Sequence, residues 1–118
     1  MDEKEIMIDP CYIIAIALMY KKSLNGEFFE RVEKELSKEY DVDLSLNNVI
    51  ESVYEWKDFF RLTDDGRVIF TEYSIKNKFY IEYLFCNALE DEVYKKVVDV
   101  ILNKKPKQQK TIVLRFPK

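Results

Sequence analysis

The chain has 118 residues, 47% of them apolar and 35% charged, which is enough for one hydrophobic core and unlike a disordered composition. Its longest uncharged apolar run, residues 11–20, is about half the length of a membrane span. No basic leader with a small-residue cleavage site accompanies this run, so we expect a cytoplasmic protein without a membrane segment.

The net charge of −3 hides an asymmetry along the chain. Residues 1–102 carry 13 basic and 22 acidic side chains, a balance of −9, whereas residues 103–118 carry six basic side chains and no acidic one. An acidic body with a basic tail concentrates attraction for phosphate at the C-terminal end.

Residue types that usually carry catalysis or bind metals are scarce. There is no histidine, and Cys11 and Cys86 lie far apart among apolar neighbours, which predicts buried structural thiols rather than a redox pair or a zinc site. Two glycines cannot form a phosphate-binding loop, and adjacent Asp64 and Asp65 are explained by turn chemistry. We therefore expect no enzyme, no cofactor and no metal.

The first half of the chain predicts three helices. Asp9-Pro10 is a favourable helix start, and the segment to about residue 22 is apolar on nearly every side, as a central buried helix would be. After the turn at Asn25-Gly26, residues 27–40 show one apolar stripe on a charged helix. Ser45 is expected to cap a third helix over residues 46–56.

A hairpin signal follows at residues 59–71. The pair Asp65-Gly66 lies between two runs of strand-forming residues, the strongest short-range signal for a β-hairpin. Ser74 is expected to cap a helical segment over residues 75–102, either one helix or two helices broken near Glu90-Asp91. Residues 103–109 are expected to form a linker, and residues 111–116 a strand that joins the hairpin sheet or awaits a partner.

Three helices followed by a hairpin resemble the winged helix-turn-helix family over about residues 9–73. The resemblance depends on the helical pattern of residues 46–56 and on the wing-like run Phe60-Arg61-Leu62-Thr63-Asp64-Asp65-Gly66-Arg67-Val68. It implies a mainly α fold with a small β-hairpin. We expect a single domain over residues 1–102, with a core of 9–73, a helical extension of 74–102 and a basic tail of 103–118.

In this family the third helix enters the DNA major groove and the wing touches the adjacent backbone. Carried over, the resemblance gives the third helix five outward residues: Asn47, Asn48, Glu51, Ser52 and Glu55. The two asparagines suit an adenine edge or a phosphate, whereas the two glutamates oppose phosphate. The residues expected to bind nucleic acid are Asn47, Asn48, Ser52, Lys57, Arg61 and Arg67, with Lys104, Lys105 and Lys107 in the tail.

Two function classes therefore remain open. One is a non-catalytic regulator of transcription that binds duplex DNA through the third helix, the wing and the tail. The other is a protein–protein interaction module, in which an acidic winged-helix scaffold docks a partner and the tail adds a strand or a peptide.

The tail and the last helical segment suggest two protein contacts. Gln109, Ile112 and Phe116 have the spacing of the sliding-clamp-binding peptide, which this segment resembles, with Arg115 where the motif has an aromatic; an ordinary strand is the alternative. Residues 75–102 are apolar on more than one face, which predicts a homodimer through this segment.

Overall fold

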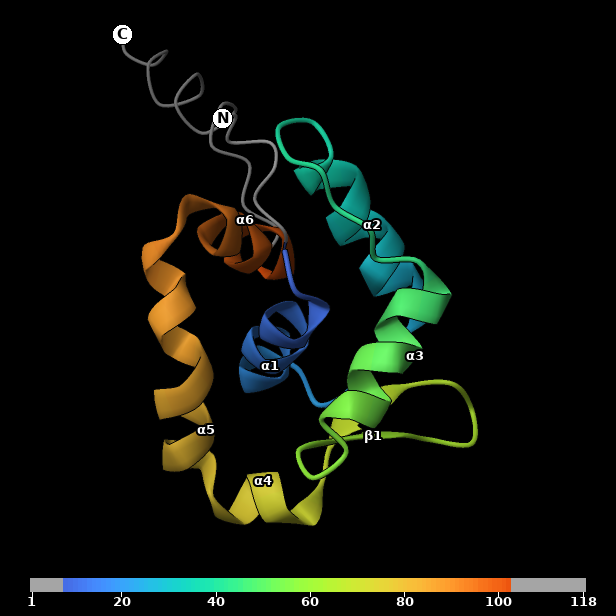
Figure 1. Ribbon diagram of the computed structural model, residues 1–118, viewed down its shortest axis with the longest axis vertical. Helices are drawn as coiled ribbons and strands as arrows, with labels where there is room; N and C mark the ends of the chain where they lie inside the picture. Colours follow the sequence, from blue (N-terminus) through green and yellow to red (C-terminus); the bar gives the residue numbers. More distant parts are fainter. Residues whose placement is uncertain (1–7, 103–118) are drawn as a thin grey trace, which may run out of the picture.

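The computed structural model describes residues 8–102, and helix α1 (Pro10–Tyr20) lies at its centre, surrounded by the other helices (Figure 1). The Asp9 carboxylate accepts a hydrogen bond from the Cys11 amide at 3.1 Å, and Pro10 occupies the first turn, as expected for a capped helix start. Cys11 and residues 13–18 are all buried. The prediction of a central buried helix is therefore confirmed.

Helix α2 (Gly26–Leu36) is capped by Asn25, whose side chain accepts a hydrogen bond from the Phe28 amide at 3.0 Å. Its apolar stripe is buried. The helix ends at Leu36, whereas the sequence pattern predicts an end at residue 40. Residues 37–39 form a turn instead, in which the Leu36 carbonyl accepts from the amides of both Glu39 and Tyr40.

Helix α3 (Leu46–Glu55) begins directly after Ser45, as predicted, although the Ser45 side chain makes no capping hydrogen bond. The Asp43 carboxylate instead accepts from the Ser45 amide at 3.0 Å, and this hydrogen bond lowers the pKa of Asp43. The Glu33 carboxylate of α2 accepts from the Leu44 amide at 3.0 Å. The last residues of the connection, directly before α3, are thereby held against α2.

The predicted hairpin is confirmed. Strands β1 (Phe60–Leu62) and β2 (Val68–Phe70) pair antiparallel, with Phe60 opposite Phe70 and Leu62 opposite Val68. In the loop, the Thr63 amide donates to the Arg67 carbonyl at 2.8 Å and the Gly66 amide to the Thr63 carbonyl at 3.0 Å. Gly66 has a φ of 83°, the left-handed conformation that closes such a three-residue loop.

Leu24 extends this sheet by one residue, which the sequence did not predict. It forms an antiparallel bridge with Val68, its amide donating at 3.0 Å and its carbonyl accepting at 2.8 Å. Because Leu24 connects α1 to α2, the bridge holds the hairpin against the start of α2.

The C-terminal half contains α4 (Glu72–Lys76), α5 (Lys78–Phe85), the 3₁₀-helix η2 (Cys86–Glu90) and α6 (Glu92–Ile101). Of the two alternatives left open for this segment, the structure shows the one with a break near Glu90-Asp91, and a second break, which the sequence did not predict, occurs at Asn77. Ser74 is not the helix cap: Thr71 accepts from the Ser74 amide at 3.3 Å, and Ser74 is fully buried inside α4. The helix begins earlier than predicted because Thr71 follows directly after β2.

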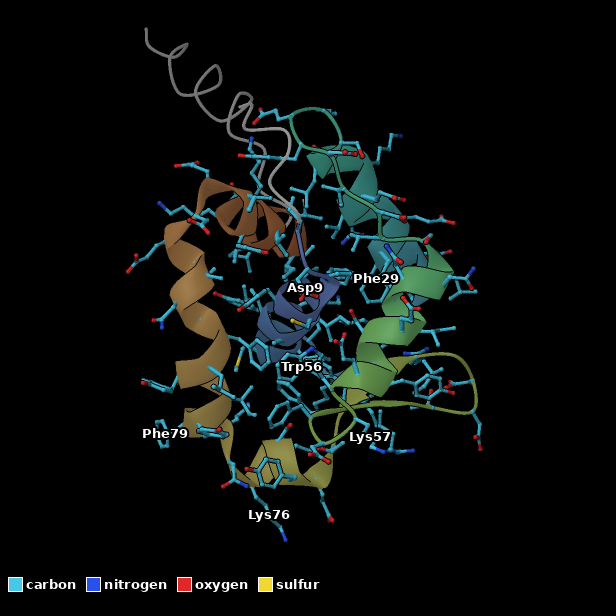
Figure 2. All side chains as sticks on the ribbon, in the orientation of Figure 1. Asp9, Phe29, Trp56, Lys57, Lys76 and Phe79 are labelled. Atoms are coloured by element: carbon cyan, nitrogen blue, oxygen red, sulfur yellow. The ribbon has the colours of Figure 1, made fainter. Side chains whose placement is uncertain are left out.

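Aromatic rings join these elements into one core. Phe85 of α5 makes edge-on or tilted contacts with Tyr12, Trp56, Phe59 and Phe60, at centroid distances between 5.6 and 6.1 Å. Figure 2 shows Trp56 in the interior between α1 and α3. The expected fold class, mainly α with a small antiparallel sheet, is confirmed at that level. Within residues 8–102, no helix combines the length and apolarity needed to cross a membrane.

Candidate functional site

Arg67, the wing cation predicted from the sequence, follows directly after the hairpin loop and is fixed by neighbours on both sides. Its Nη1 donates to Ser23 Oγ at 3.0 Å, and its Nε lies 3.4 Å from Asp65 Oδ2. The Thr63 hydroxyl donates to the Asp65 carboxylate, and this hydrogen bond lowers the pKa of Asp65. The guanidinium of Arg67 is therefore held between the hairpin and the α1–α2 connection.

A surface pocket of about 470 Å³ lies at this position, and we call it the basic pocket. Its cationic residues come from three segments: Lys21 and Lys22 after α1, Arg31 on α2, and Arg67 on the hairpin. Glu27 is the one acidic residue among those that line it. Four cations thus gather around one pocket on a chain whose net charge is negative.

The sequence pattern missed three of these four cations. Lys21-Lys22 forms a short basic run directly after an apolar helix, a signal that the sequence does contain. Arg31 has no such signal, because it lies on a helix with many charges of both signs. Leu24 pairing with Val68 brings these segments together, and a bridge of one residue leaves no recognisable strand pattern.

The residues predicted on the outward face of α3 do not all lie there. Asn47 is exposed, but Ser52 is only 5% exposed, so its prediction as an outward residue is wrong. Ser52 lies three residues after Val49 and directly before Val53. Both valines are buried, and Ser52 lies on the same side of the helix as they do. The side-chain Nδ2 of Asn48 donates to the Asp43 carbonyl at 3.1 Å. Glu51 and Glu55 are exposed, so the solvent face of α3 is acidic.

The remaining predicted nucleic-acid residues are not in the basic pocket. Arg61 is exposed on β1, and Lys57 lies just past the end of α3 beside the hairpin (Figure 2). Neither lines the basic pocket. The predicted tail residues lie outside the described part of the chain: Lys104, Lys105, Lys107, Gln109, Ile112 and Phe116.

An apolar groove of about 340 Å³ lies between α2, α3 and the hairpin. Its apolar lining residues are Phe29, Leu44, Leu46, Val49, Ile50, Leu62 and Val68. Glu30 and Glu33 also line it, and no lysine or arginine does. Leu46, at the start of α3, is 71% exposed beside this groove. The α3 side of the hairpin is therefore apolar and acidic, whereas the α1 side is basic.

No protein-family model, curated protein or solved structure matches this chain. Among residues 8–102, no three histidine, cysteine, aspartate or glutamate side chains are grouped to hold a metal ion.

Proposed function

We propose that this chain is a non-catalytic winged-helix protein that binds duplex DNA chiefly through the phosphate backbone. The winged-helix assignment draws support from the order of α1, α2 and α3 followed by a hairpin, in which Arg67 follows the loop and binds Ser23 of the α1–α2 connection. Regulation of transcription is the process that fits such a protein, with residues 103–118 adding further cations.

The basic pocket is the observation that carries this proposal. Duplex DNA presents one negative charge per about 1.7 Å of its axis, so a protein that binds it needs several cations in one place. Lys21, Lys22, Arg31 and Arg67 provide such a group. On a protein of net negative charge, this gathering favours a polyanionic ligand.

The solvent face of helix α3 favours neither phosphate contact nor extensive base reading. Asn47 is the exposed polar residue at its start, whereas Glu51 and Glu55 repel a DNA backbone. Contacts to phosphates position a protein on DNA but do not read its sequence. We therefore expect binding with weak sequence preference and strong dependence on salt.

The proposal is tested by fluorescence anisotropy with a labelled duplex over a series of salt concentrations. The double variant Lys22→Ala with Arg31→Ala should reduce the magnitude of the slope of log K against log salt by about two and weaken binding on the order of tenfold. Neither residue forms an ion pair among residues 8–102, so the fold should not change.

A matched control removes two cations elsewhere. Lys38→Ala with Lys95→Ala changes the net charge by the same amount, and both side chains are exposed away from the pocket. The control should leave the slope nearly unchanged. Absence of duplex binding by the unmodified protein at low salt, or equal losses in both double variants, would refute the proposal.

The apolar groove favours a second candidate function, the docking of a protein. Because its charged lining residues are both acidic, the partner would be a segment with apolar and basic side chains. Leu46→Glu should abolish binding of such a partner, whereas Tyr54→Glu, on the same helix outside the groove, should not. Deletion of residues 107–118 tests the tail separately. If the deletion abolishes partner binding and Leu46→Glu does not, the contact belongs to the tail.

A further inference from the structure

Helix α5 exposes two large rings on the side that faces away from the core. Phe79 is 88% exposed and Tyr83 is 72% exposed, and the four-residue spacing places them one above the other on the helix. Ile81 and Phe85 lie on the opposite side and are buried. Figure 2 shows Phe79 at the outer edge of the molecule, projecting from α5.

A third ring extends these two into a patch. Tyr80, next to Phe79 on the same helix, is about half-exposed, at 47%. A contiguous apolar patch of this kind on a small protein usually marks an interaction site. We call Phe79, Tyr80 and Tyr83 the α5 face.

The charges beside the α5 face are arranged asymmetrically. Lys78 and Glu82 are both exposed and lie one helical turn apart on one flank of the Phe79–Tyr83 line. The opposite flank within α5 carries Tyr80 and Leu84 and no charge. Neither Lys78 nor Glu82 forms an ion pair among the described residues.

This arrangement fits a second copy of the chain in antiparallel orientation. When two identical helices pack antiparallel about a twofold axis, each flank of one helix meets the same flank of the other. Lys78 would then lie opposite the partner's Glu82, and Glu82 opposite the partner's Lys78. In a parallel pair, the flank with Lys78 and Glu82 would instead meet the partner's flank with Tyr80 and Leu84, which carries no charge.

We propose that the protein forms a homodimer through the α5 face, with the two α5 helices antiparallel and with reciprocal Lys78–Glu82 ion pairs. Large aromatic side chains bury on the order of 150 Å² each. Three from each copy, with the charged residues beside them, approach the roughly 1,000 Å² of a specific interface. The proposal is independent of DNA binding, because it involves neither the basic pocket nor α3.

Sedimentation equilibrium of the full chain tests the interface. The unmodified protein should be dimeric at micromolar concentration, and Phe79→Lys should weaken the dimer by at least about tenfold. Tyr54→Lys is the matched control, because Tyr54 is 66% exposed on α3 and should have no effect. A monomeric unmodified protein at about 100 μM, or equal effects of the two variants, would overturn the proposal.

Charge reversal tests the antiparallel orientation. Lys78→Glu and Glu82→Lys should each weaken self-association, because each places like charges across the interface. A mixture of the two variants should form a heterodimer, because both cross-interface pairs then have opposite charges. Residues 78 and 82 carry like charges within each variant, so recovery in the mixture reports only the contact between copies. A mixture that stays monomeric would rule out the antiparallel dimer.

Discussion

The backbone conformation of Gly66 fixes the turn of the hairpin. Its φ of 83° lies in the left-handed region, which residues with a β-carbon adopt at a cost of about 1–2 kcal/mol. A β-carbon built at Gly66 would meet no atom within 4 Å. Any effect of a larger residue there comes from the backbone conformation and not from crowding.

Gly66→Ala should therefore lower the free energy of unfolding by about 1 kcal/mol. Gly26→Ala is the control, because Gly26 also has open space around it but no left-handed φ. Gly26→Ala should change the free energy of unfolding by no more than about 0.5 kcal/mol. Any change should be an increase, because alanine reduces the conformational entropy of the unfolded chain. Urea denaturation of both variants measures the difference. Equal losses would show that backbone strain at Gly66 is not the cause.

Among the elements, α4 is capped by Thr71 and not by Ser74. Both are favourable capping residues, and the sequence alone predicts Ser74 as the cap. In the fold, Ser74 Oγ donates to the Phe59 carbonyl at 2.8 Å from a fully buried position. Thr71 accepts from the Ser74 amide and donates to the Asp58 carbonyl at 2.7 Å. Both side chains bind α4 to the segment before β1.

Thr71→Ala should destabilise the protein by about 1–2 kcal/mol, since it removes a cap and a second hydrogen bond. Ser45→Ala is the matched control, because Ser45 occupies the same position before α3 but makes no capping hydrogen bond with its side chain. Ser45→Ala should lower the free energy of unfolding by less than about 0.5 kcal/mol. Thermal denaturation of both variants distinguishes them, and a larger effect of Ser45→Ala would contradict the assignment of Thr71 as the cap.

At the scale of the whole molecule, burial of ionisable groups where α1 packs against α6 couples folding to alkaline pH. Burial raises the pKa of the Cys11 thiol above its ordinary value, and the Asp9 carboxylate adds to the effect. Burial likewise raises the pKa of Tyr94, and the charge that Cys11 carries when ionised raises it further. Both groups remain protonated in the folded chain where the unfolded chain releases its protons.

Stability should therefore be constant near neutral pH and fall as the pH rises above about 9, the ordinary value for a thiol. There the unfolded state binds fewer protons than the folded state. Cys11 therefore lowers the free energy of unfolding by about 1.4 kcal/mol per pH unit above this pH, and Tyr94 adds to the fall only above about 10, the ordinary value for a tyrosine. Urea denaturation between pH 8 and about 10.5 measures this slope. Cys11→Ala should make it shallower, and an unchanged slope would show that Cys11 is not responsible.

The same packing explains the expected reactivity of the two cysteines. Cys11 is buried, as the sequence predicted, whereas Cys86 is only partly buried. The thiolate is the reactive form, and burial raises the pKa of both thiols. Both should react slowly with iodoacetamide at pH 7.5, Cys86 before Cys11, which mass spectrometry of the labelled peptides would measure.

Local patterns in the sequence determined much of the fold. Asp9-Pro10 and Asn25 predicted two helix starts because capping acts within three residues, and Asp65-Gly66 predicted the hairpin because its loop needs a left-handed residue. The end of α2 and the break at Asn77 were missed. Both occur where neither glycine nor proline interrupts the helical pattern.

Only the tertiary structure decided which surfaces these elements present. Phe79 and Phe85 are the same residue type on the same helix, yet one is exposed and the other buried, because α1 and the hairpin pack against only one side of α5. Arg67 could be predicted as a cation of the hairpin from its place after Gly66. Its grouping with Lys21, Lys22 and Arg31 depends on contacts between segments distant in the chain, and periodicity and capping do not encode such contacts.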